Sequence, residues 1–157
     1  MKIMHYVTFS ISITFISWLV GLVLNALIQN NPYYIHVSHF NFIKSEKLNK
    51  IIGLEFFKWI VKNSFFKYFN QKITLKNKKT ELSEIRHEMT IAEIGHLIGF
   101  GFVTIFVFLK ISNGNYLFGL IMMLVNIIMN LYPSLLQQEN KRRIDQLIKK
   151  YKTTANN

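Results

Sequence analysis

Two residues that can exchange protons, Glu93 and His96, interrupt an otherwise uncharged apolar run in the second half of the chain. They are three positions apart, so on a helix they occupy neighbouring positions one turn apart. Histidine titrates near neutral pH and can act as a general base, and a carboxylate beside it can orient the ring. An ionisable side chain at membrane depth is costly and usually faces the interior of a helix bundle or a wet cavity. Any reactive centre is therefore expected here.

Three apolar runs supply the elements that must position these side chains. Residues 6–27 and 116–136 contain no Asp, Glu, Lys or Arg, and residues 91–109 contain only Glu93 of these types before Lys110. Each run has about 20 residues, which as a helix crosses a hydrocarbon layer of about 30 Å. The sequence therefore predicts an all-α integral membrane protein with about three transmembrane helices in a single domain over residues 1–157.

The first run has an alternative interpretation as a cleavable signal peptide, because the basic residue Lys2 precedes it. A signal-peptide apolar region is shorter, about 7–15 residues. The end of the run, Leu24-Asn25-Ala26-Leu27-Ile28-Gln29, is also a poor small-residue cleavage site. An uncleaved transmembrane helix is favoured.

Two further segments are amphipathic. Residues 51–69 carry charges on one helical face and apolar side chains on the other, which predicts a helix lying in the membrane interface. After Pro133, residues 137–157 form a cytoplasmic tail in which an apolar stripe is flanked by lysines and arginines. The fold class predicted is thus three spans, an in-plane amphipathic helix and a basic amphipathic C-terminal helix.

Composition excludes several kinds of site. The chain has no cysteine, so thiolate zinc sites and disulfides are ruled out. His36 and His39 have an H-x-x-H spacing, but Pro32 and its aromatic neighbours predict extended chain there, and no metal site is expected. The net charge of +11 fits an anionic lipid surface, and no motif for binding nucleic acid is present.

The last two spans are expected to form an antiparallel hairpin, because the turn dipeptide Asn113-Gly114 lies between them. Gly95 and Gly99 have the small-xxx-small spacing that allows close helix approach. Asn126 and Asn130 are four residues apart and share a helix face. We expect this asparagine face to meet the side of its neighbour that carries the two glycines and Ala92.

Counting Lys and Arg outside the spans predicts the orientation. The connection 28–87 contains eleven and the C-terminal tail six, whereas the N-terminus and the turn 110–115 contain one each. The two basic regions fall on the same side of a three-span bundle. The N-terminus is therefore expected outside, and the large loop and C-terminus in the cytoplasm.

Three segments carry motifs similar to those of one small family of bacterial membrane proteins. Glu88-x4-Glu93-x2-His96, with Ala92 before the second glutamate, is similar to the family's E-x3-A-E-x2-H stretch. Residues 130–133 (NLYP) with 137–143 (QQENKRR) resemble its C-terminal motif, and residues 57–59 (FKW) its lysine-tryptophan pair. Where the family has an arginine and a tyrosine, this chain has Gln138 and Glu139. The family that the chain resembles includes the glycosyl-4,4'-diaponeurosporenoate acyltransferases of staphyloxanthin synthesis.

The resemblance implies an acyltransferase of the bacterial cell membrane. It would move a fatty acyl group from a carrier such as acyl-CoA to a hydroxyl of a glycosylated isoprenoid or other lipid, with membrane lipids as partners and no bound cofactor. The catalytic residues implied are His96, Glu93 and Glu88. The residues implied to bind substrate are Asn126, Asn130, Gln137, Asn140, Lys141, Arg143 and Trp59.

A non-catalytic alternative is a small scaffold protein of the membrane, in which the same polar residues serve helix packing. A metal-dependent membrane hydroxylase or hydrolase is a distant third, because histidines are sparse. No G-x-S-x-G nucleophile motif is present, so the acyl transfer would be direct rather than through an acyl-enzyme.

Overall fold

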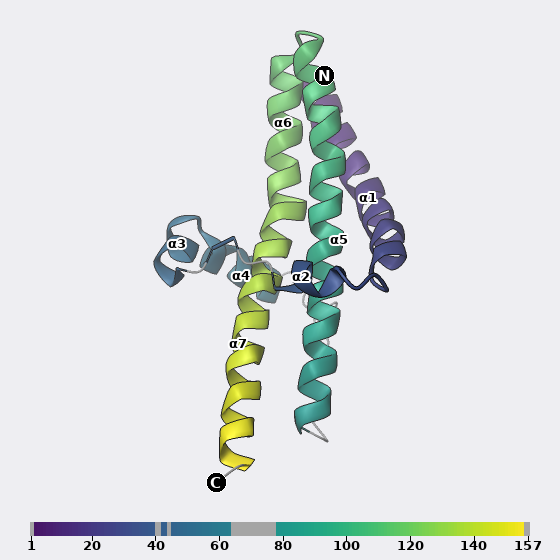
Figure 1. Cartoon of the computed structure of the whole chain (residues 1–157). Coiled ribbons are helices and arrows are strands. Elements are labelled where there is room, and N and C mark those ends of the chain that lie inside the picture. Colours follow the sequence, from purple (N-terminus) through teal and green to yellow (C-terminus); the bar gives the residue numbers. More distant parts are fainter. Residues whose placement is uncertain (1, 40–41, 44, 64–77, 156–157) are drawn as a thin grey trace. The chain divides into compact units, whose positions relative to one another are not determined.

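Every regular element of the described residues is a helix. The computed structural model describes residues 2–39, 42–43, 45–63 and 78–155. In chain order the elements are α1 (Lys2–Ile28), α2 (Tyr34–Ser38), α3 (Glu46–Ile51), α4 (Leu54–Asn63), α5 (Lys78–Ser112), α6 (Tyr116–Asn126), the π-helical segment η2 (Ile127–Leu131) and α7 (Tyr132–Ala155) (Figure 1).

Three helical stretches are long and apolar enough to cross a membrane. They are Lys2–Ile28, Leu82–Ser112 and Tyr116–Tyr151. Each contains one of the predicted spans, 6–27, 91–109 or 116–136. The predicted all-α membrane fold is confirmed.

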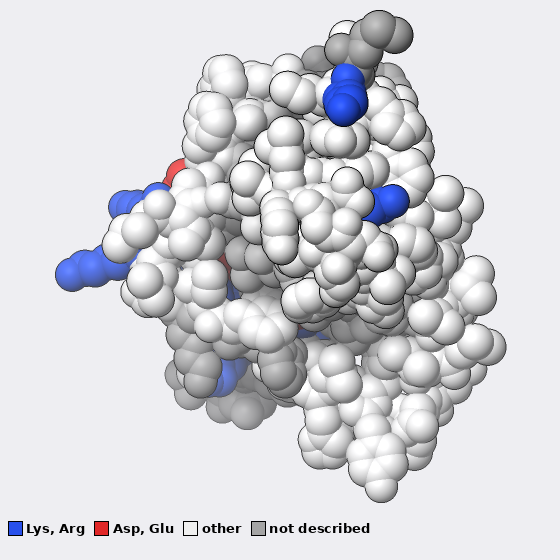
Figure 2. Space-filling view, turned by 90° about the horizontal axis from the view of Figure 1, so that it is seen from above, with Lys and Arg blue, Asp and Glu red and all other residues white. Residues whose placement is uncertain are grey.

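The chain divides into two compact units. The first consists of Met1–His39 and Ile91–Ser134, and the second of Phe40–Thr90 and Leu135–Asn157. The single membrane domain expected from the chain length stays a prediction. Figure 2 looks toward the end of the first unit that carries the α5–α6 turn, and the face it shows is mainly uncharged with scattered Lys and Arg atoms.

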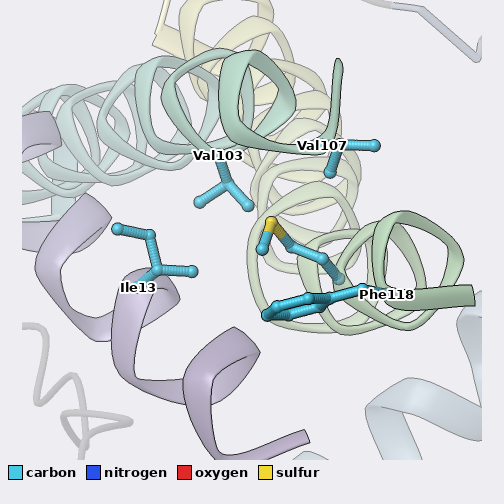
Figure 3. Packing of buried hydrophobic residues seen from close by; sticks show 5 residues of the cluster. Ile13, Val103, Val107 and Phe118 are labelled. Carbon is cyan, nitrogen blue, oxygen red and sulfur yellow. The ribbon is translucent and has the colours of Figure 1, made fainter. Parts of the chain in front are cut away.

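The first unit has its apolar core where α1, α5 and α6 pack together. Side chains from the three helices converge there, and Figure 3 shows how closely they approach one another. The core residues are Ile13, Val103, Val107, Phe118 and Met122. This cluster lies toward the α5–α6 turn, whereas the polar residues described below lie farther along the same helices.

Helices α1 and α5 cross at very short range. A Cβ built on Gly21 would lie well inside van der Waals contact with the carbonyl oxygen of Gly95. One built on Gly99 would lie 3.1 Å from Ser17 Oγ and 3.1 Å from Asn130 Oδ1. The small-xxx-small face of α5 was predicted to meet the third span. It meets α1 as well, and at Gly95 the contact is with α1.

A π-helical segment interrupts the last membrane helix. Pro133 has no N–H, so the carbonyl oxygen of Met129 cannot receive the usual α-helical hydrogen bond from position 133. The π-helical residues Ile127–Leu131 come directly before this position. Such segments change the direction of side chains relative to a regular helix and occur frequently at functional sites. Here the segment carries Asn130.

The second unit is held together by charged groups. Lys58 of α4 donates to Glu139 Oε1 of α7 at 2.5 Å, and Arg143 donates to the same oxygen at 2.8 Å. Arg86 of α5 donates to Asp145 of α7 at 2.5 Å. Ion pairs thus connect α7 to α4 through Glu139 and to α5 through Asp145.

Two local predictions were wrong or incomplete. The residues after Pro32 form the helix α2 rather than extended chain, with the N–H of Tyr34 bonded to the carbonyl of Asn31 at 2.9 Å. The helix predicted over 51–69 is α4 in the part described, and residues 64–69 lie outside the described residues. It begins at Leu54, because Gly53 at φ 76° separates it from α3.

Candidate functional site

The side-chain amide of Asn130 is the centre of a buried polar cluster in the first unit. Its Oδ1 accepts a hydrogen bond from Trp18 Nε1 at 3.0 Å. Its Nδ2 donates to Ser17 Oγ at 3.1 Å and to Asn126 Oδ1 at 2.9 Å. Asn126 and Asn130 are completely buried. Because a buried amide without partners costs free energy, this cluster fixes how α1 and η2 meet.

Asn126 extends the cluster to α5. Its Nδ2 donates to the carbonyl oxygen of Phe100 at 3.0 Å and contacts Thr104 Oγ1 at 3.3 Å. The predicted meeting of the asparagine face with α5 therefore occurs. It involves Phe100 and Thr104 in addition to the Gly99 side.

His96 of α5 belongs to the same cluster. A side-chain hydrogen bond links it to Asn130, and its ring lies edge-on to the indole of Trp18, with ring centres 6.0 Å apart. Its Nδ1 is buried and has no hydrogen-bond partner among the described residues. An imidazole held in place on one side, with a nitrogen available on the other, has the arrangement of a general base.

Glu93 lies one helical turn before His96 and is completely buried. It acts electrostatically on Tyr34 of α2. Burial raises the pKa of Tyr34, and the carboxylate of Glu93 adds to this rise. The carboxyl group predicted for the reactive centre thus lies inside the first unit, close to a tyrosine that the sequence interpretation had not included.

The structure brings together the predicted residues of the first unit. His96, Asn126 and Asn130 share the polar cluster, and Glu93 is buried on the helix that carries His96. Within the described ranges, His, Cys, Asp and Glu form no group of three or more that could hold a metal ion.

The other predicted site residues belong to the second unit. Glu88 is exposed and lines a shallow hollow with Ser83, Glu84 and His87. Trp59 is exposed and stacks on Phe56.

On α7, the predicted substrate-binding residues differ in exposure. Lys141 is buried, and Arg143 is exposed with its guanidinium bonded to Glu139. Gln137 and Asn140 are half-buried. The roles predicted for these residues and for Glu88 and Trp59 stay predictions.

Four polar residues of the first unit were missed from the sequence. Ser17 and Trp18 bond to Asn130, and Asn25 and Tyr34 bond to each other. The first helix does carry a signal for two of them, Ser17 and Asn25. Its buried face contains small or polar residues at the helical spacings of three and four, namely Ser10, Thr14, Ser17, Gly21 and Asn25. A polar stripe of this kind along an otherwise apolar span indicates contact with other polar groups inside a bundle.

The fold and cluster define a helical membrane protein with a polar centre inside its span region. The family model of glycosyl-4,4'-diaponeurosporenoate acyltransferase matches residues 30–150. The chain belongs to this family. Neither a curated protein nor a solved structure matches the chain.

Proposed function

We propose that the protein is a membrane-embedded acyltransferase that moves a fatty acyl group onto a hydroxyl of a glycosylated isoprenoid or similar lipid. One observation carries the proposal: in a chain of this family, His96 is joined to Asn130 inside the span region and keeps a nitrogen without a described partner. The acyl donor is a carrier thioester such as acyl-CoA, and no bound cofactor is required.

In the proposed step, His96 acts as the general base. It takes the proton of the acceptor hydroxyl as the oxygen attacks the carbonyl carbon of the thioester. The C–O bond forms, the C–S bond breaks, and the departing thiolate receives the proton from the imidazolium. The products are the acyl ester and the free thiol of the carrier, so no oxidant or reductant is needed.

The asparagines supply the second requirement of acyl transfer. Negative charge develops on the carbonyl oxygen in the transition state, and an oriented N–H donor in a water-poor site stabilises it. Asn126 and Asn130 are the proposed donors. Both amides donate to protein acceptors in the structure, so one N–H must exchange its partner to reach the oxyanion. The longest of these bonds runs from Asn126 Nδ2 to Thr104 Oγ1 at 3.3 Å. Glu93 would stabilise the imidazolium that forms on His96.

The basic residues of α7 are proposed to bind the phosphates of the carrier. Lys141 and Arg143 lie within a tail that carries six Lys and Arg residues. That tail and the basic loop are proposed to lie in the cytoplasm of a bacterial cell, with the N-terminus outside the cell membrane, as the charge distribution favours. Trp59, Gln137, Asn140 and Glu88 remain candidates for contacts with substrate on the same side.

The second candidate function is a non-catalytic membrane scaffold. The observation that favours it is that Asn126 and Asn130 bond to each other, to the α5 backbone and to α1. Such contacts serve helix packing in many membrane proteins. Under this alternative the loss of His96 or Glu93 affects only the amount of folded protein.

The variants His96→Ala and Glu93→Gln separate the two candidates, with His87→Ala, an exposed histidine on the same helix, as the control. Membrane accumulation and the acylated lipid or pigment profile are measured together in one host. Catalysis predicts normal accumulation with loss of the acylated product in the first two variants. Loss of the protein itself supports the scaffold, and an unchanged lipid profile at normal accumulation rejects these two residues as catalytic.

A further inference from the structure

A short chain of hydrogen bonds connects α2 to the part of α5 that carries Glu93. Tyr34 Oη donates to Asn25 Oδ1 at 3.0 Å. Asn25 Nδ2 donates in turn to the carbonyl oxygen of Ile91 at 2.9 Å. Tyr34 is 7% exposed and Asn25 is 1% exposed. All the groups belong to the first unit.

A buried tyrosine at this position has a specific consequence for α5. Ile91 lies two residues before Glu93, within the same turn, so a side chain bonded to the Ile91 carbonyl restrains the backbone that carries the carboxylate. Asn25 uses both ends of its amide in this arrangement, and Tyr34 fixes which way the amide points. Phenylalanine would fill the same volume, but it would leave Asn25 Oδ1 without this donor.

We propose that Tyr34 is a positioning residue for Glu93, acting through Asn25 on the α5 backbone at Ile91. This inference rests on the proposed acyltransferase function and extends it to α2. The electrostatic coupling between Tyr34 and Glu93 supports the same placement, because the carboxylate opposes ionisation of the phenol. Tyr34 stays protonated and does not itself exchange a proton with substrate.

The test compares Tyr34→Phe with Tyr33→Phe in membranes that contain the full chain. Tyr33 is the adjacent tyrosine and is 75% exposed, so its variant makes the same chemical change without the buried contact. The probes are palmitoyl-CoA and glycosyl-4,4'-diaponeurosporenoate. Tyr34→Phe is expected to lower kcat at least about tenfold, because small displacements of catalytic groups have effects of this size. KM for the acceptor should stay within about twofold, as for a group that does not bind substrate.

A double-mutant cycle with Asn25→Ala gives the second readout. Because Tyr34 and Asn25 act through one contact, the double variant should resemble the more impaired single variant, and the two effects on kcat should not multiply. Thermal unfolding in detergent is measured for each protein. A fall in kcat at an unchanged unfolding temperature is the expected result for Tyr34→Phe.

Each outcome decides between the two proposals. A wild-type chain that forms no ester overturns the proposed function, and the inference with it. A wild-type chain that forms ester while Tyr34→Phe keeps the wild-type kcat overturns the inference alone. Loss of activity that follows loss of folded protein, or effects of Tyr34→Phe and Asn25→Ala that multiply, also overturn it, because Tyr34 would then serve packing.

Discussion

Asn130 and Trp18, which are 112 positions apart in the sequence, are joined by a hydrogen bond of 3.0 Å from the indole Nε1 to the amide Oδ1. The bond places the indole beside His96, whose ring it meets edge-on. The same amide bonds to Ser17 and Asn126. One side chain of the π-helical segment therefore connects α1 with the last membrane helix and lies next to the proposed base.

Replacing Asn130 by alanine should destabilise the first unit. The change removes the acceptor of Trp18 Nε1 and the donor to Ser17, and hydrogen bonds between membrane helices contribute about 1–2 kcal/mol in model systems. The unfolding temperature in detergent should fall, with loss of acyl transfer. Asn115→Ala is the control, because Asn115 is exposed. Equal unfolding temperatures for the two variants would show that the hydrogen bonds of Asn130 do not stabilise the first unit.

Gly21→Ala should disrupt the crossing of α1 and α5. The added methyl group meets the Gly95 carbonyl, and overpacking of this kind costs about 1–3 kcal/mol. Gly101→Ala makes the same chemical change where nothing lies within 4 Å of the new Cβ. Because alanine is the better helix former by about 1 kcal/mol, the control should be neutral or stabilising. Membrane accumulation and thermal unfolding measure both. Tolerance of Gly21→Ala at wild-type stability would show that the helices do not approach this closely.

Glu139 should be necessary for the attachment of α4 to α7. Its Oε1 receives both Lys58 and Arg143, and the Lys58 and Glu139 side chains are each 11% exposed. Glu139→Gln removes the charge, and the loss of a hydrogen bond between charged groups costs about 1.5–3 kcal/mol. Hydrogen exchange of α4 amides should accelerate, whereas it should not in the control Lys149→Ala, whose side chain is exposed. Unchanged exchange in Glu139→Gln would exclude the ion pair as the attachment.

Alkaline pH should lower the folding stability of the wild-type protein more than that of Tyr34→Phe. Burial raises the pKa of Tyr34 above its usual value near 10.0, so the folded state holds the phenolic proton more tightly than the unfolded state. The resulting stabilisation is fully present below pH 10 and is lost as the pH rises through the folded-state pKa. The wild type and Tyr34→Phe should therefore unfold at the same temperature below pH 10, and the wild type should unfold at the lower temperature above pH 10. Tyr33→Phe should follow the wild type. Equal unfolding temperatures of the wild type and Tyr34→Phe at every pH would contradict the raised pKa of Tyr34.

The proposed orientation can be tested with single cysteines, because the natural chain has none. The two variants are Asn113→Cys and Gln146→Cys. Position 113 lies in the turn between α5 and α6, and position 146 lies on the exposed side of α7. In intact cells a membrane-impermeant maleimide should label position 113, and it should reach position 146 only after permeabilisation. The reverse pattern would place the N-terminus in the cytoplasm.

The spans and the asparagine face were predictable from the sequence because they depend on local composition and helical spacing. Uncharged runs of about 20 residues fix the spans, and the spacing of Asn126 and Asn130 fixes their common face. The partners of that face were only partly predictable. Trp18 and Ser17 reach Asn130 across more than 110 positions, and no local rule specifies such a pairing.

Helix α2 is an element for which the local sequence preference predicted the wrong structure. Pro32 and the β-branched and aromatic residues after it favoured extended chain, yet residues 34–38 are helical. The phenol of Tyr34 is buried against Asn25, and this tertiary contact outweighs the weak local preference. A five-residue helix has too few turns for its pattern to be recognised in advance.

Acyl transfer by base catalysis at His96 can be measured on the purified full chain in detergent. The substrates are palmitoyl-CoA and glycosyl-4,4'-diaponeurosporenoate, and the acyl ester and free CoA are detected by mass spectrometry. The wild type and His87→Ala should each form the ester and free CoA in equal amounts. His96→Ala should react at least about a hundredfold more slowly at the same unfolding temperature. Ester formation by folded His96→Ala at the wild-type rate would show that His96 is not the base.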